Sequence, residues 1–66
     1  MSTCRIIVFL SGGMISVNLT DGRFIYGEKH FRVSHTALKY IDSLLSSGNY
    51  MDENTASFVE KMRGEK

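Results

Sequence analysis

Apolar and polar residues alternate along the first half of the chain, and this period of two predicts β-strands. The expected strands cover residues 4–10, 14–19 and 23–33. Gly12-Gly13 and Asp21-Gly22 separate these runs, and both dipeptides are typical of two-residue hairpin turns. Gly27, inside the third run, is expected to mark a β-bulge. The pattern therefore predicts a three-stranded antiparallel meander.

The two turns also define how the strands pair, since a two-residue turn fixes the register of its hairpin. Directly paired residues share a face of the sheet, and both turns place apolar side chains on the same face. The expected core face comprises Ile6, Val8, Leu10, Ile15, Val17, Leu19, Phe24 and Tyr26. The opposite face is expected to carry Arg5, Ser16, Asn18, Thr20 and Arg23, together with Ile7, Phe9 and Ile25. In this register Asn18 lies between Ile7 and Ile25.

The second half of the chain has a helical period. Ser34 is expected to cap a first helix, and Gly48 is expected to end it. Asn49 followed by Asp52 resembles the capping box of a second helix. The residues expected to face the sheet are Ala37, Leu38, Ile41, Leu44 and Leu45, then Met51, Thr55, Phe58, Val59 and Met62. The short link at Gly48 predicts a helical hairpin.

These elements predict one small α+β domain of 66 residues with the order β-β-β-α-α. The β-meander is expected at residues 4–33, and the helical hairpin at 34–63 packs on one face of it. Residues 64–66 form a frayed tail. A chain of this length buries a small core, and its single cysteine, Cys4, allows no internal disulfide. We therefore expect a homodimer.

The stretch FLSGGMIS is similar to the SGGxDS loop of the PP-loop ATP pyrophosphatases, in which glycine amides after a strand hold pyrophosphate. Ser11, Gly12, Gly13 and Ser16 match that pattern, whereas Ile15 stands where the family has Asp. The family's loop leads into a helix, whose N-terminus helps to bind the anion. The residues that follow the glycines here alternate with period two. The sequence therefore favours a hairpin turn over a phosphate loop.

Charge and hydropathy argue against several classes of protein. The net charge is +1 without a block of like charge, whereas a non-specific nucleic-acid binder usually carries a basic stripe. The longest apolar run, residues 6–10, is too short to span a membrane. A single free thiol is typical of a reducing compartment. We therefore expect a cytoplasmic protein without a membrane partner.

The candidate catalytic and metal-binding residues do not form a recognisable site. His30 and His35 lack a third ligand at fixed spacing. Helix capping explains Ser34, although it stands next to His35, and Cys4 is expected to be a structural thiol. The sequence therefore predicts a protein that is not an enzyme, with no catalytic residue, cofactor or metal.

Ile7, Phe9 and Ile25 carry the functional hypothesis. The first strand is expected at the sheet edge and is apolar on both faces, which usually means that both faces are buried. We expect a partner to cover this edge or this apolar face, with Arg5 and Arg23 beside it. The favoured function is a small protein-binding regulator or inhibitor, such as a phage or mobile-element accessory protein.

The alternative function is a small nucleic-acid-binding regulator that uses the basic residues of the sheet half. These residues are Arg5, Arg23, Lys29 and Arg32. Aromatic residues among them could stack on single-stranded bases. Both hypotheses place the binding surface on the sheet.

Overall fold

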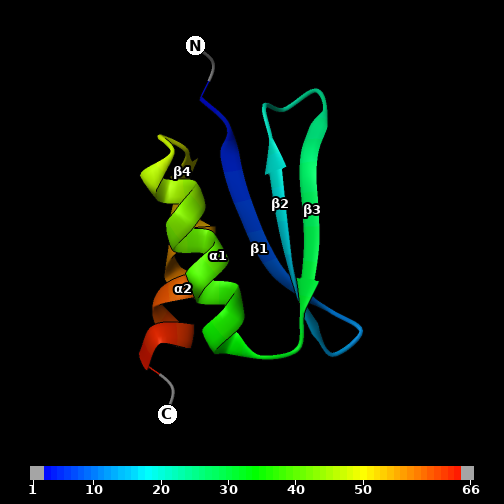
Figure 1. Cartoon of the computed structure of the whole chain (residues 1–66), viewed down its shortest axis with the longest axis vertical. Helices are drawn as coiled ribbons and strands as arrows, with labels where there is room; N and C mark the ends of the chain where they lie inside the picture. Colours follow the sequence, from blue (N-terminus) through cyan, green and yellow to red (C-terminus); the bar gives the residue numbers. More distant parts are fainter. Residues whose placement is uncertain (1–2, 65–66) are drawn as a thin grey trace.

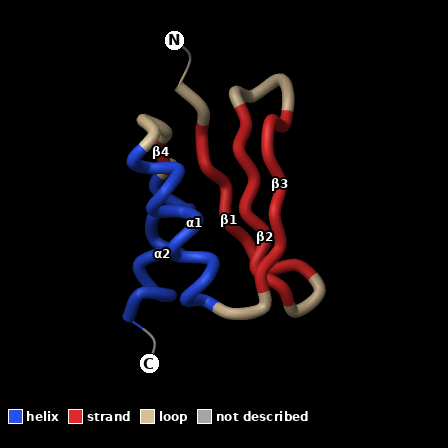
Figure 2. Tube along the Cα trace, in the orientation of Figure 1, coloured by secondary structure: helices blue, strands red, loops and turns tan. Residues whose placement is uncertain are grey.

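The computed structural model describes residues 3–64 and contains one sheet and two helices. The elements are β1 (Arg5–Ser11), β2 (Met14–Thr20), β3 (Ile25–Phe31), α1 (Ser34–Ser46), β4 (Tyr50–Met51) and α2 (Glu53–Gly64). Strands β1, β2 and β3 lie to one side of the helices in Figure 1, whereas β4 is drawn beside the helices. Figure 2 separates the two kinds of element by colour. The expected α+β meander followed by two helices is confirmed, with a short strand added between the helices. The expected tail falls partly on residues 65–66, which lie outside the described residues.

The strand order is β3-β2-β1-β4, and β4 pairs in parallel with β1. The added strand joins Tyr50 to Arg5 and Met51 to Ile6. The expectation that β1 forms the sheet edge is therefore wrong for the first part of that strand. The chain also does not turn directly from one helix into the next, because β4 crosses to β1 between them.

The turn at Gly12-Gly13 has the predicted geometry. Both glycines have positive φ, at 59° and 79°, as a type I′ turn requires. The register that follows pairs Leu10 with Ile15, Val8 with Val17, and Ile6 with Leu19. All these pairs were expected, so the first hairpin is confirmed and the phosphate-loop alternative is not formed.

The prediction of a two-residue hairpin turn at Asp21-Gly22 is wrong. Asp21 does not have positive φ, which the type I′ turn would need. Its carboxylate instead accepts the backbone N–H groups of Arg23 and Phe24, at 2.8 and 3.0 Å, and the Tyr26 hydroxyl at 2.7 Å. These bonds build a longer loop. As a result Leu19 pairs with Gly27 rather than with Phe24, and the register shifts beside Gly27, where a bulge was expected.

The core lies between the sheet and the two helices. It comprises Ile6, Val8, Ile15, Val17, Ala37, Ile41, Val59 and Met62. Three residues were wrongly expected in the core, because Leu10, Phe24 and Tyr26 are 63, 63 and 59 % exposed. Phe24 and Tyr26 are displaced by the longer second loop. Leu10 lies at the tip of the first hairpin, which turns away from the helices in Figure 1.

The helix ends follow the sequence signals in part. Val33, in extended conformation, precedes α1 without a side-chain cap, so Ser34 is the first helical residue rather than the cap. Gly48 has φ 93° and donates to the Leu45 carbonyl, which gives the expected glycine-terminated end. Asp52 itself caps α2 by accepting the Thr55 N–H at 2.8 Å. The prediction of a capping box that starts at Asn49 is therefore wrong.

Asn49 connects the end of α1 to the start of β1. Its Oδ1 accepts the Cys4 N–H at 3.2 Å, and its Nδ2 donates to the Leu44 carbonyl at 2.9 Å. The adjacent Tyr50 N–H donates to the Cys4 carbonyl at 3.1 Å. This junction places β4 beside β1 and so determines where α2 begins.

Replacing the amide of Asn49 tests the importance of this junction. We expect Asn49→Ala to lower the free energy of unfolding by about 1–3 kcal/mol, because the substitution removes both side-chain hydrogen bonds in a partly buried place. Urea denaturation gives the value. Asn54→Ala, at an exposed position of α2, is the matched control and should change stability by about 0.5 kcal/mol or less. Equal effects of the two substitutions would contradict this role.

Hydrogen bonds from the folded chain lower the pKa values of three aspartates. The Phe24 N–H, with further bonds from Tyr26 and Arg23, lowers the pKa of Asp21 below 3.8. The Thr55 N–H does so for Asp52, and the Arg63 guanidinium for Asp42. An aspartate whose pKa is lower in the folded than in the unfolded chain stabilises the fold at pH values above its unfolded-state pKa. This contribution is lost as the pH falls through its folded-state pKa.

We therefore expect the urea midpoint to be steady above about pH 5 and to fall as the solution is acidified below about pH 4. Asp21→Asn should have a lower midpoint at neutral pH and a shallower fall in acid, since it no longer binds a proton there. Midpoints measured for both proteins across this range check the expectation. Parallel curves for Asp21→Asn and the unaltered chain would show that this carboxylate does not contribute.

Candidate functional site

The sheet has one face without helices, and we call it the open face. The register places the following residues on it: Arg5, Ile7, Phe9, Ser16, Asn18, Thr20, Ile25, Glu28, His30 and Tyr50. Strand β2 supplies a polar stripe through the middle, formed by Ser16, Asn18 and Thr20. Residues of β1 and β3 flank this stripe on either side.

The structure divides the apolar patch that the sequence predicts. Ile7 is half-buried, and Phe9 and Ile25 are 40 and 60 % exposed. Ile7 pairs with Asn18 and Phe9 with Ser16, so these two lie together on β1. Ile25 pairs with Thr20 on the other side of the stripe. The expected contact of Ile25 beside Asn18 is wrong, because the longer loop brings a different residue of β3 to that position.

Glu28 occupies the place expected for Ile25, and it begins a chain of polar contacts across β3 and β2. The Glu28 Oε2 lies 3.4 Å from the His30 Nε2. The His30 Nδ1 lies 2.9 Å from the Ser16 Oγ. Sequence reasoning missed this group, since Ser16 and His30 face each other only in the observed register.

The Ser16–His30–Glu28 chain has the residue types of a hydrolytic triad. Its geometry, however, holds side chains in place and does not present a nucleophile. Ser16 is 0 % exposed, so its hydroxyl is not presented to a substrate in this structure. Both ring nitrogens of His30 already face protein partners. The arrangement therefore fixes His30 on the open face and holds β3 against β2.

Two polar atoms on the open face are buried without a hydrogen-bond partner among residues 3–64. They are the Nε of Arg5 and the Oδ1 of Asn18. Thr20 lies on the same face and is satisfied, since its hydroxyl donates to the Phe24 carbonyl at 2.6 Å and accepts the Gly22 N–H at 3.0 Å. A buried polar group without a partner costs about 1–3 kcal/mol. One unpaired donor and one unpaired acceptor therefore lie close to the exposed side of the sheet.

The basic residues expected to share a surface are separated. Arg5 is on the open face, while the Lys29 ammonium lies 5.1 Å from the centre of the Tyr40 ring on the helix side. Arg23 is in the loop between β2 and β3, and Arg32 follows β3. The four side chains therefore do not form one basic strip.

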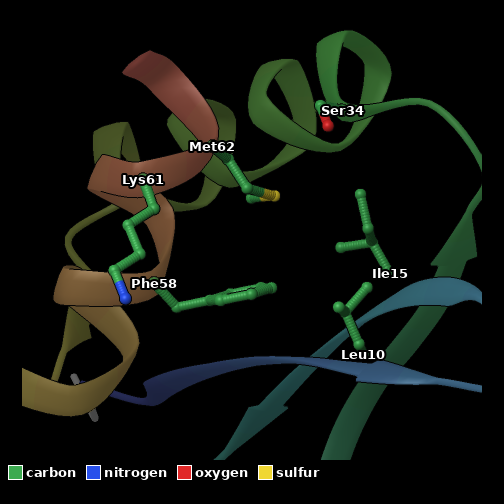
Figure 3. A pocket seen from close by; sticks show the side chains of 6 residues that line it. All are labelled: Leu10, Ile15, Ser34, Phe58, Lys61 and Met62. Carbon is green, nitrogen blue, oxygen red and sulfur yellow. The ribbon is translucent and has the colours of Figure 1, made fainter. Parts of the chain in front are cut away.

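An apolar cavity of about 170 Å³ opens between the first hairpin and the helices. It is lined by Leu10, Ile15, Ser34, Phe58, Lys61 and Met62. Figure 3 shows Phe58 and Met62 directed toward Leu10 and Ile15, with the Lys61 amine pointing away. Its walls can contact an apolar group, and they carry no cluster of charges.

Other candidate groups have structural positions. Cys4 is a buried free thiol whose backbone takes part in the Asn49 junction. His35 is exposed in the first turn of α1. Within residues 3–64, no group of three or more His, Cys, Asp or Glu side chains is placed to hold a metal ion. Neither helix in that range is both long and apolar enough to cross a membrane.

Comparison with known proteins finds no matching family model, no matching curated protein and no matching solved structure. The function of the chain is therefore inferred from its open face and its sheet edges.

The unpaired acceptor on Asn18 gives a stability test. We expect Asn18→Val to raise the free energy of unfolding by about 0.5–2 kcal/mol, because it removes a buried polar atom that has no partner in the described chain. Thr20→Val, the matched change on the same strand, should lower it by about 1–3 kcal/mol, because Thr20 makes two hydrogen bonds. Urea denaturation measures both values. A loss of stability in Asn18→Val as large as that in Thr20→Val would contradict the assignment.

Proposed function

We propose that this protein is a small binding module that regulates or inhibits another protein through the open face of its sheet. The observation that carries the proposal is the exposed Phe9 ring, which follows half-buried Ile7 on the same face of β1, where no helix covers the sheet. An apolar side chain that stays exposed in the free protein gains burial in a complex. An exposed aromatic ring supplies a large part of the apolar contact area of such an interface.

The chemistry of the face describes the partner we propose. A partner would offer an apolar side chain to the surface around Ile7 and Phe9, and hydrogen-bond acceptors to the half-buried Arg5 guanidinium on the same strand. Ile25 would contribute contact area across the polar stripe. Arg23, in the neighbouring loop, would lie at the rim of such an interface.

Nucleic-acid binding has less support than protein binding. An extended phosphate backbone is usually followed by a continuous groove of positive charge. Here Lys29 lies on the helix side, and Glu28 places a carboxylate on the open face.

A charge introduced at Phe9 tests the proposed interface. The chain, immobilised on resin, is exposed to a lysate of the organism that encodes it, and retained proteins are identified by mass spectrometry. We expect Phe9→Asp to lose the proteins that the unaltered chain retains, since desolvating a carboxylate opposes binding of an apolar surface.

Val33→Asp is the matched control, because Val33 is also exposed but lies at the start of α1, away from the open face. Circular dichroism establishes that both variants fold. Proteins retained by the unaltered chain and Val33→Asp, but not by Phe9→Asp, support the proposal. The same proteins on all three resins, or none specific to the chain, would rule it out.

A further inference from the structure

We propose that the outer edge of β3 pairs with β3 of a second copy of this chain. β3 ends the sheet on one side and has no strand beyond it among residues 3–64. All its residues except Gly27 and Phe31 are exposed, and the chain contains no proline. A long edge strand of this kind is a template for further pairing.

The register shows which backbone groups point outward. The Gly12-Gly13 turn closes on a hydrogen-bonded pair, and the alternation along β2 then directs the backbone of Val17 toward β3. Lys29 pairs with Val17, so its N–H and C=O face inward. The backbone groups of Glu28 and His30 therefore face outward and are available to another strand.

Lysine on an edge strand commonly prevents such pairing, but Lys29 is not placed to do so. Its ammonium lies over the Tyr40 ring, on the helix side of the sheet. On the opposite side, His30 is held between Ser16 and Glu28, which keeps this part of the strand in place. The edge is therefore ordered and unobstructed.

The charges of the edge favour a second copy over an unrelated peptide. Glu28 and Arg32 carry opposite charges at equal distances along the chain from His30. If two copies pair antiparallel about a two-fold axis at His30, and the pairing continues to Arg32, the residue directly after β3, each Glu28 faces Arg32 of the other copy. Opposite charges directly across a strand pair are stabilising. Moving the axis to Lys29 would instead place two lysines opposite each other.

Such pairing would join two four-stranded sheets into one, with the helices of both copies on the same side. The two open faces would then lie side by side, and neither would be covered. This inference concerns a different surface from the proposed function, and neither depends on the other. Self-pairing would also add burial to a small chain of 7.5 kDa.

Charge exchange at Glu28 and Arg32 tests the pairing. Sedimentation equilibrium of the unaltered chain should give about twice 7.5 kDa. Glu28→Arg and Arg32→Glu alone place like charges across the seam, so each should raise the dimer dissociation constant at least about tenfold. The double variant restores opposite charges and should recover the dimer.

Lys39→Glu, at an exposed position of α1, is the matched control for Arg32→Glu and should leave the mass unchanged. Circular dichroism checks folding, and Arg32→Glu stays informative even if Glu28→Arg disturbs His30. A monomer at all concentrations up to about 1 mM would overturn the proposal. A dimer that ignores both single variants, or a double variant that does not recover, would overturn it as well.

Discussion

The junction of Asn49 and Tyr50 with Cys4 is the interaction on which the rest of the structure depends. It joins the end of α1 to the start of β1 and makes β4 a fourth strand. Because α2 begins directly after β4, its apolar side then reaches the core at Val59 and Met62. Both helices therefore pack on one face of the sheet, and the other face is exposed to solvent.

The parts of the fold that depend on local chemistry could be predicted from the sequence. Gly12 and Gly13 can both adopt positive φ, so the first turn and its register followed directly. The Asp21-Gly22 turn failed because the Asp21 carboxylate accepts three hydrogen bonds and stabilises a different loop. A two-residue strand such as β4 has no periodicity to detect, and its pairing arises from long-range contacts.

The same failure explains what could be predicted of the candidate site. Ile7 and Phe9 were placed correctly because they depend on the first turn. Ile25 was placed beside Asn18, and the Ser16–His30 contact was missed, because both depend on the second turn. The unpaired atoms of Arg5 and Asn18 depend on packing around single atoms, which no residue pattern records.

The long separation in sequence between Cys4 and Asn49, 45 residues, has a consequence for the order of folding. The pairings of β1 with β2 and of β2 with β3 are local and can form early, whereas β4 and α2 must close a large loop. During synthesis, the part of the core face that α2 covers would thus stay exposed to water until the last quarter of the chain leaves the ribosome. Over that interval the nascent sheet exposes apolar surface on both sides, and the packing of α2 completes the burial of its core face.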